Sequence, residues 1–470
     1  MNDINIQEEI LENALFSEIQ IGQVATISRT LTMQDIQAFA AVSGDTNPTH
    51  LDPEFADQEN LDGVVGHSMW TGSQISTLLG TRFPGPGTKY LSQSFKFKRA
   101  IHVNDTAITT VKVVSKDEAQ QSVTMDCSVV NQNGQVILEG QAIVKAPENK
   151  VLRPLSSVPL VQLFDPVARM KDLLSLGAGL EPVQCGVVHP CDEGSLKGAM
   201  DAAHQGLINP ILIGPESKIR QLAEEFGIDL HGAKIISTVH SHESAVRAAT
   251  MAAEGQLETL MKGSLHTDEL MHAVVSNPAL RTKRRISHVF RFDVPLYSKP
   301  LLITDAALNI KPTLMEKRDI VQNAIDLAWI LGRENPKVAI LSAVETVNPN
   351  IPSTIDAAAL CKMADRGQIT GGLLDGPLAF DNAVSPEAVR IKHIKSPVAG
   401  DAEILVVPDL ESGNMLSKQL EYLAGASGCG VVLGAKLPIA LTSRADGPAA
   451  RMASALLVMR IAHHYRKHRP

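Results

Sequence analysis

Residues 43–50 read SGDTNPTH and place an aspartate, Asp45, and a histidine, His50, five residues apart on one turn. Gly44 opens the turn and Pro48 stiffens it, because glycine and proline each favour tight turns. A general acid/base pair needs two titratable groups held on one small cavity, and a constrained turn can hold them there. The alternative is that this segment forms only a turn, since Asp, Asn and Pro are common in turns whatever their function.

The sequence after this turn favours a catalytic role. A glycine-bearing loop, DGVVGHS at residues 62–68, precedes a mostly apolar helix that we expect over residues 68–79. The N–H groups at the start of a helix are free to stabilise an oxyanion. The N-terminal region would then hold an acid/base pair and an oxyanion-binding backbone within one small domain.

The first 145 residues have the pattern of an α+β domain. A helix is expected over residues 32–42, with Thr32 as its N-cap. Strands are expected over residues 90–97, 107–114, 122–131 and 136–144, and NQNG at residues 131–134 is a hairpin signal. One long buried helix with a set of antiparallel strands is an α+β arrangement.

The pattern changes after a segment rich in Pro and Ser, PENKVLRPLSSVP at residues 147–159. Beyond it, strand-like runs alternate with helices, which indicates a mainly parallel sheet with helices on both faces. The expected strands are residues 183–188, 211–213, 301–304, 338–341, 404–407 and 431–433. We therefore expect an α+β domain over residues 1–146, a linker over 147–160 and a two-lobed α/β domain over 161–470.

Composition excludes several classes of protein. The 470 residues carry a formal net charge of −8, which argues against broad nucleic-acid binding. The five cysteines are odd in number and widely spaced, which indicates reduced thiols; Cys185, His189 and Cys191 lack a fourth ligand, so we expect no metal site. The N-terminus has no signal-peptide pattern and no run reaches about 18 apolar residues, so a cytoplasmic protein without membrane spans is expected.

The N-terminal region resembles the MaoC-like (R)-specific enoyl-CoA hydratases. The segments that carry the resemblance are FAAVSGDTNPTHLD, VVGHSMWTGSQISTLLG and GTKYLSQSFKFKRAIHVNDT, within about residues 17–146. The resemblance implies a hot-dog fold, usually dimeric, that adds water to a trans-2-enoyl-CoA. Asp45 and His50 would activate the water and deliver the proton, and Asn47 would shape the turn.

The resemblance also implies two further roles on the central helix. Ser76 matches a serine that positions the catalytic carboxylate, and the thioester oxygen would lie against the backbone N–H near Ser68. The family usually has His-Gly-Met at this helix start, whereas this chain has His67-Ser68-Met69. Since glycine allows close approach of a backbone N–H, the serine could crowd the thioester or change the preferred acyl length.

The C-terminal region contains polar segments at expected strand ends, where ligands of open α/β sheets bind. A guanidinium beside a hydroxyl, as in Ser443-Arg444, makes a good clamp for phosphate or an oxyanion, although a surface turn before a helix would look the same. The basic run RTKRR at residues 281–285 could hold CoA phosphates or could be a solvated face. The loop GCGVVLG at residues 428–434 lacks the third glycine of a dinucleotide loop, so we expect no bound nucleotide cofactor.

Taken together, these segments resemble the phosphate acetyl/butyryltransferase family over about residues 160–468. The matching segments, in family order, are MKGSLHTDELMHAVV, SHVFRFDVPLYSKPLLITDAALNI, GGLLDGPLAFDNAVS, PDLESGNMLSKQLEYLAG and LTSRAD. The resemblance implies two α/β lobes with a cleft between them, in a protein that commonly dimerises. It also implies reversible acyl transfer between CoA and inorganic phosphate, without metal or nucleotide cofactor.

The residue roles implied by this second resemblance concern the phosphate and the thiol. Arg444 would contact the phosphoryl group or the developing oxyanion, and Ser443 would hydrogen-bond the same centre. The residues expected to line the cleft or its strand-end loops are Lys262, Asp305, Gly413 and Asn414. Acetyl-type members have an Asp where this chain has Ala450, so the nearer Asp446 is the candidate base, as in the butyryl type.

The two halves together predict a bifunctional enzyme whose substrates are CoA thioesters and phosphate. One alternative is a transferase with a non-catalytic hot-dog module that binds acyl-CoA or dimerises. Another is a hot-dog thioesterase, because hydrolysis also uses a carboxylate-activated water. A NAD-linked dehydrogenase is the alternative that fits the sequence least well. We expect small-molecule substrates, a dimer-based homo-oligomer, and no nucleic-acid or membrane partner.

Overall fold

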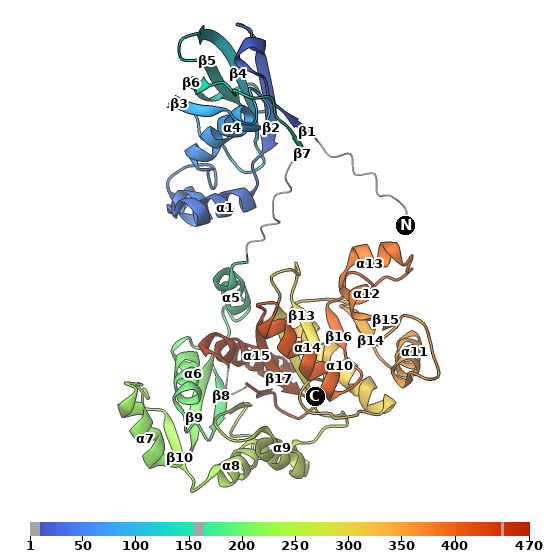
Figure 1. Cartoon of the computed structure of the whole chain (residues 1–470). Helices are drawn as coiled ribbons and strands as arrows, with labels where there is room; N and C mark the ends of the chain where they lie inside the picture. Colours follow the sequence, from blue (N-terminus) through green and yellow to red (C-terminus); the bar gives the residue numbers. More distant parts are fainter. Residues whose placement is uncertain (1–9, 155–163, 443–445) are drawn as a thin grey trace. The chain divides into compact units, whose positions relative to one another are not determined.

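The computed structural model describes residues 10–154, 164–442 and 446–470, which fall into two compact units. The first unit is Met1–Leu163 and the second is Phe164–Pro470, and each is described by itself (Figure 1).

The first unit has a long helix wrapped by an antiparallel sheet. The helix is α4 (Ser68–Thr81). The sheet has the order β2 (Val24–Thr30), β4 (Thr106–Asp117), β5 (Ser122–Val130), β6 (Val136–Lys145) and β3 (Lys89–Phe97), with every pairing antiparallel. Trp70, Ile75 and Leu78 of α4 are buried against the sheet. This is the expected hot-dog arrangement, and β2 is a strand that the sequence pattern did not predict.

Three short helices lead into this centre: α1 (Met33–Ser43), α2 (Pro48–Leu51) and α3 (Pro53–Gln58). Thr32 caps α1 as expected, and Asp35 completes a capping box with it. Gly44 ends α1 with φ = 76°, a left-handed conformation that is cheap for glycine. The chain therefore turns sharply just before Asp45.

Part of the expected linker is ordered within the first unit. Strand β7 (Leu152–Pro154) pairs with β1 (Ile10–Glu12) in an antiparallel ladder. Lys150 forms ion pairs with Glu12 and Glu18, at 3.0 Å each. The folded part of this unit thus reaches beyond the expected boundary at residue 146.

The second unit contains one 11-stranded sheet among the described residues, with the order β10-β9-β8-β11-β18-β17-β12-β13-β16-β14-β15. The strand bounds are β8 (Val183–Val188), β9 (Ile208–Gly214), β10 (Lys234–Ser237), β11 (Thr259–Lys262), β12 (Ser287–Asp293), β13 (Leu301–Thr304), β14 (Lys337–Leu341), β15 (Leu373–Leu378), β16 (Ile404–Val406), β17 (Ser427–Leu433) and β18 (Ile439–Ala440).

Most neighbours in this sheet are parallel, as expected, but its centre is not. The pairs β18–β17, β17–β12 and β12–β13 are antiparallel. The parallel strands on the β11 side therefore run opposite to those on the β16 side. This reversal brings the carboxyl ends of β11 and β13 to nearly the same level, because Met261, Ala440, Val431, Val289 and Thr304 are in register across the centre.

Helices cover both faces of the sheet (Figure 1). The larger helices are α5 (Pro166–Ser175), α6 (Glu193–His204), α7 (Glu216–Glu225), α8 (Ser241–Ala253), α9 (Thr267–Ser276), α10 (Leu314–Ile330), α11 (Pro352–Asp365), α14 (Leu410–Tyr422) and α15 (Pro448–Lys467); α12 (Phe380–Val384) and α13 (Pro386–Ile391) are short.

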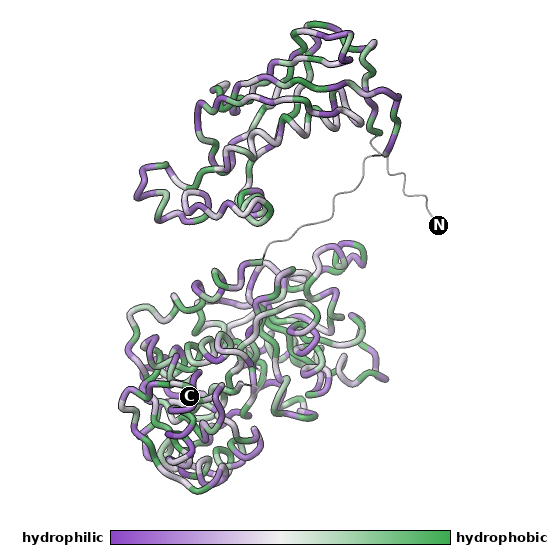
Figure 2. The backbone as a smooth tube through the Cα atoms, turned by 60° about the vertical axis from the view of Figure 1, so that its left-hand side comes forward, coloured by the Kyte–Doolittle hydropathy of each residue, from purple (hydrophilic) through white to green (hydrophobic). Residues whose placement is uncertain are grey.

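The cores show which helices cover which face. Residues of α6, α10, α11 and α15 share one continuous core on what we call the first face. On the second face, α8 and α9 cover one half of the sheet and α12 and α14 the other half, in two separate cores. Figure 2 shows hydrophobic segments running through the interior of this unit. The expected cleft between lobes would lie on the second face, between these two cores, and stays a prediction.

Candidate active sites

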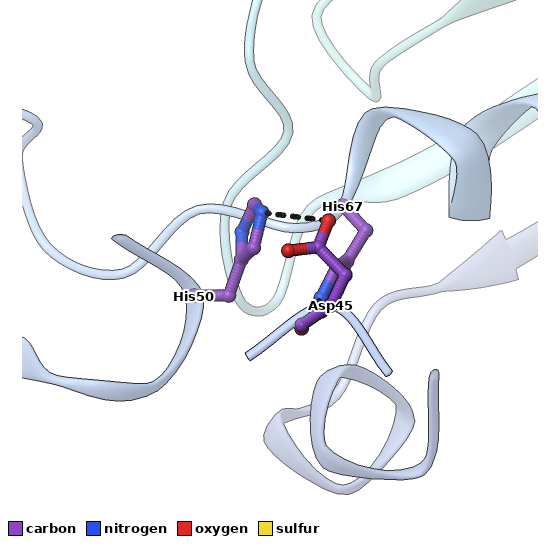
Figure 3. A group of neighbouring side chains, drawn as sticks. All are labelled: Asp45, His50 and His67. Carbon is purple, nitrogen blue, oxygen red and sulfur yellow. Dashed lines mark hydrogen bonds and ion pairs between the residues drawn. The ribbon is translucent and has the colours of Figure 1, made fainter. Parts of the chain in front are cut away.

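The first unit brings Asp45 and His50 together on one turn (Figure 3). The Asp45 Oδ2 and His50 Nε2 atoms are 3.9 Å apart. The Asp45 side chain is 53% exposed, whereas that of His50 is 13% exposed. The carboxylate can therefore reach a substrate from solvent, and its separation from the imidazole exceeds a direct hydrogen bond.

The hydrogen bonds of His50 fix its neutral tautomer. Nδ1 lies 2.7 Å from the Val65 carbonyl oxygen. Since a carbonyl only accepts, Nδ1 must carry the proton and donate it. The other ring nitrogen, Nε2, faces Asp45, so this pair can take a proton from a water molecule and return it elsewhere.

A third residue, His67, completes this group and was not named as a site residue from the sequence. Its Nε2 lies 3.0 Å from the backbone oxygen of Asp45, so Nε2 donates. Its ring stacks on that of His50 with centroids 3.8 Å apart. His67 is 2% exposed, and its Nδ1 has no hydrogen-bond partner within the described residues. The signal available in the sequence was its place directly before the helix.

The amino end of α4 lies next to this group. His67 is the N-cap of α4, yet its side chain does not cap the helix. Within the described part of the chain, the N–H groups of Ser68 and Met69 donate no hydrogen bond to the protein. Ser68 is exposed, so its side chain can point to solvent and leave the N–H accessible. This helix end can accept a negatively charged oxygen, and its expected oxyanion-binding role stays a prediction.

The other two predicted residues of this site have different positions. Asn47 shapes the turn: its side chain accepts from the Thr49 N–H at 3.2 Å and caps α2. Ser76 lines a surface pocket with Tyr90. No hydrogen bond joins Ser76 to Asp45 among the described residues, so its expected role stays a prediction.

In the second unit, predicted residues gather on the second face of the sheet. Lys262, at the end of β11, is 4% exposed, and its Nζ lies 3.5 Å from the Thr442 carbonyl oxygen. Alternation along β11 places Lys262 on the same face as Leu260, which belongs to the second-face core. A buried ammonium therefore lies beside the segment that leads into residues 443–446.

Asp305 builds the neighbouring loop. Its Oδ1 accepts from the N–H groups of Ala307 and Leu308 at 2.9 and 3.0 Å. Its Oδ2 accepts from the Asn309 amide at 2.5 Å and from the His288 N–H at 3.2 Å. With these bonds, the carboxylate orders residues 305–309, so its contribution to a binding site would be to shape this loop.

The expected Gly413 and Asn414 lie at the first turn of α14, against that loop. Asn414 Nδ2 donates to the Ala306 oxygen at 3.4 Å. An added Cβ on Gly413 would stand 2.9 Å from the Asp305 oxygen. Asn414 and Asp305 thus belong to one packed corner of the second face.

His288 of β12 is a buried residue of this region that the sequence reading did not single out. It is 0% exposed, and neither ring nitrogen has a hydrogen-bond partner within the described residues. Gly430 makes room for it, because a Cβ there would stand 2.4 Å from His288 Nε2. Burial lowers the pKa of His288 to about 4, against the opposing effect of Asp305, so the ring is neutral near pH 7.

The predicted Ser443 and Arg444 lie outside the described residues. The chain enters this segment at Thr442, whose Oγ1 accepts from the buried Arg451 guanidinium at 3.0 Å. It leaves the segment at Asp446, which is partly buried. Ala450, where the acetyl type has an Asp, lies in the first turn of α15.

The basic run at residues 281–285 borders a pocket of about 420 Å³ on the second face. Arg281, Arg284 and Arg285 line it together with Leu308 and Asn309. Asn309 also bonds Asp305. This pocket therefore adjoins the Asp305 loop, as a site for CoA phosphates would require.

One group in the described part of the chain has metal-ligand spacing, namely Asp45, His50 and His67, whose ligand atoms lie within 4.8 Å of one another. We interpret it as the acid/base group, because it contains the Asp45–His50 pair that the sequence predicts on this turn. Cys185, His189 and Cys191 form no such group there. Among the described helices, none combines the length and apolar character needed to cross a membrane.

The two units thus define a hot-dog domain with an acid/base turn and an α/β domain with a buried cationic corner. Residues 237–458 match the family model described as "Phosphate acetyl/butaryl transferase", and residues 17–134 match "MaoC like domain". A phosphate acetyltransferase of Rhizobium meliloti is 63% identical over 269 residues, which are 57% of this chain and 85% of that protein. The chain belongs to the phosphate acetyl/butyryltransferase family and carries an N-terminal MaoC-like domain.

Two solved structures are also similar. A branched-chain phosphotransacylase from Enterococcus faecalis V583 is 31% identical, covers 60% of this chain and 99% of its own, and has a TM-score of 0.53. The R-hydratase PhaJ1 from Pseudomonas aeruginosa is 34% identical, covers 33% of this chain and 100% of its own, and has a TM-score of 0.32.

Proposed function

We propose that this chain is a bifunctional enzyme of CoA thioesters. The second unit transfers an acyl group between CoA and inorganic phosphate, and the first unit hydrates a trans-2-enoyl-CoA to the (R)-3-hydroxyacyl-CoA. Family membership supports the transferase activity. The observation that carries the hydratase activity is the pairing of Asp45 with His50 beside the open amino end of α4.

In the transferase, a phosphate oxygen attacks the thioester carbonyl, a C–O bond forms, and the C–S bond breaks to release CoA. Negative charge develops on the carbonyl oxygen and then on sulfur, so fixed cations lower the barrier. We assign this stabilisation to Lys262 and Arg444, with Ser443 as a hydrogen-bond donor. Asp446 would exchange the thiol proton, and the pocket bordered by Arg281 would hold the CoA phosphates.

The acyl group is proposed to be short. The Rhizobium meliloti relative is named for acetyl transfer, and the Enterococcus faecalis structure for branched-chain transfer. The segment DGPLAFDNA leans toward the butyryl type. Rates with acetyl-CoA, butyryl-CoA and isobutyryl-CoA, measured as acyl phosphate formed, will rank these substrates.

In the hydratase, the Asp45–His50 pair takes a proton from water while the oxygen bonds to C3 of the enoyl group. The C2–C3 π electrons move toward the thioester, and the proton is then delivered to C2. The thioester oxygen gains charge in this step, and the N–H groups of Ser68 and Met69 are placed to stabilise it. Water is added across one double bond, so no cofactor is required.

The acyl chain and a dimer partner would both use the exposed apolar strip beside α4. Met69, Tyr90 and Leu91 are 53%, 42% and 52% exposed, and they line a pocket of about 430 Å³ with Phe39 and Phe95. Strand β3 is an edge strand of its sheet, with unpaired backbone groups. We propose that the first unit dimerises along this edge.

Crotonyl-CoA and acetyl-CoA with phosphate test the two activities on the same protein. Loss of the enoyl-thioester absorbance without release of free thiol supports hydration. Release of free thiol would instead indicate a thioesterase. Acyl phosphate formation with no change in crotonyl-CoA would leave the first unit as a non-catalytic binding or dimerising module.

A further inference from the structure

The second unit has a large basic pocket at the carboxyl end of α15, which we call the basic pocket. Its volume is about 780 Å³. The cations in its lining are Arg281, Lys283, Arg284, Lys436 and Arg469. Among the described residues, Lys262, Asp305 and Asp446 take no part in this lining, whereas Arg281, Thr282 and Arg284 also line the pocket proposed for the CoA phosphates.

In the described lining of the basic pocket, five cationic side chains face one carboxylate side chain. Asp326 is the carboxylate side chain in the lining, and Arg284 already forms an ion pair with it. Within the described residues, Lys283, Lys436 and Arg469 have no ion pair or side-chain hydrogen bond. Like charges held close together favour a bound anion that separates them.

The backbone holds two of these cationic segments together. Thr282 Oγ1 donates to the Gly434 oxygen at 2.6 Å. Arg281 and Ala435 form an isolated antiparallel bridge. The segments that carry Lys283 and Lys436 are therefore bonded to each other and are not independent surface loops.

Size and lining indicate the class of ligand. Pockets of about 300–1,000 Å³ hold drug-sized molecules, which is far more than a single phosphate needs. Tyr465, His464 and His468 add rings on which a base can stack. We propose that the basic pocket binds a phosphorylated ligand of nucleotide size, distinct from the CoA of the transfer reaction.

Two observations separate this pocket from the proposed transfer centre. Leu433, Ile330 and Tyr465 place it on the first face of the sheet, whereas Lys262 and His288 lie on the second. Helix α15 runs from the segment after Asp446 to this pocket (Figure 1). At about 1.5 Å per residue, Pro448 and His464 are about 24 Å apart.

The proposal is tested by titrating the full chain with ATP in a calorimeter, with CoA already saturating the substrate site. The variant Lys283→Glu/Lys436→Glu should bind ATP at least tenfold more weakly, because two charge-assisted contacts become repulsive. The matched control is Lys171→Glu/Lys234→Glu, which makes the same change in net charge at exposed lysines outside the pocket lining. The control should bind ATP as the parent protein does.

Several results would overturn the proposal. One is an unchanged ATP affinity in the pocket variant, while acyl phosphate formation shows that this variant is folded. Another is loss of ATP binding on addition of CoA, which would make the pocket part of the CoA site. If pyrophosphate bound as tightly as ATP, the pocket would be a site for small inorganic anions.

Discussion

The imidazole rings of His50 and His67 stack with their centroids 3.8 Å apart and their planes 30° from parallel. His67 also donates to the backbone oxygen of Asp45. One buried ring therefore contacts both members of the proposed acid/base pair, and it belongs to the residue directly before α4. His67 therefore connects the proposed acid/base turn directly to the helix end that is proposed to bind the oxyanion.

Replacing His67 separates its two contacts. The variant His67→Phe keeps an aromatic ring against His50 but removes the hydrogen bond to Asp45. Because Asp45 is then less well oriented, we expect crotonyl-CoA hydration to fall about tenfold or more. His67→Leu, which loses both contacts, should fall further. Equal hydration rates for all three proteins would show that His67 only fills space.

Changes in the acid/base pair itself should reduce the hydration rate more than changes at His67. Asp45→Asn keeps the shape of the turn but cannot accept a proton, so hydration should fall about 10²–10⁴-fold. The control is Asp57→Asn, an exposed carboxylate of α3, which should hydrate crotonyl-CoA normally. The variant Asp45→Asn should retain full acyl phosphate formation, and a parallel loss there would contradict two separate sites.

Lys262 is predicted to stabilise charge in the transferase. Lys262→Met keeps most of the side-chain volume and removes the ammonium, so acyl phosphate formation should fall about 10²-fold or more. Lys311→Met, at an exposed position in the same unit, should change little. Urea unfolding of the second unit in both variants reports whether that unit is intact. A Lys262→Met enzyme with normal transferase rates would exclude a role in charge stabilisation.

His288 predicts how stability changes with pH. Its pKa is about 4 in the folded protein, below the ordinary value of about 6.5, because burial disfavours the cation. Between these two values the unfolded chain binds more protons than the folded one, so stability falls as pH falls from 6.5 toward 4. Urea unfolding of the second unit should show this loss.

The variant His288→Asn isolates this contribution, because it cannot titrate. The free energy of unfolding of the variant should depend less on pH between 6.5 and 4 than that of the parent protein, by an amount on the order of a few kcal/mol. Identical pH dependence in both proteins would mean that His288 is hydrated or charged in the folded state.

Much of the fold was predictable because local patterns and tertiary packing agree. The N-cap at Thr32 and strands β3, β4, β5 and β6 of the hot-dog sheet occur where the sequence indicates them, whereas β2 was missed. Strand β18 has only two residues, which is too short for a periodic pattern. The antiparallel centre of the large sheet depends on pairing between distant segments, which no local signal specifies.

In the candidate sites too, local features were predictable from the sequence and long-range contacts were not. Asp45 and His50 are close in sequence, so their meeting was predictable. His288 approaches Asp305 only because β12 and β13 pair, and its burial depends on Gly430 of a third strand. A histidine within an apolar strand carries no sequence signal for either fact. Likewise, the basic pocket combines residues 281–284 with residues 464–469, which only the tertiary fold brings together.

The central claim is that one chain carries two independent chemistries. The most direct test measures crotonyl-CoA hydration and acyl phosphate formation in the parent protein, Asp45→Asn and Arg444→Ala. We predict that Asp45→Asn loses only hydration and Arg444→Ala loses only acyl transfer. Loss of both activities in either variant, or no hydration by the parent protein, would contradict the account.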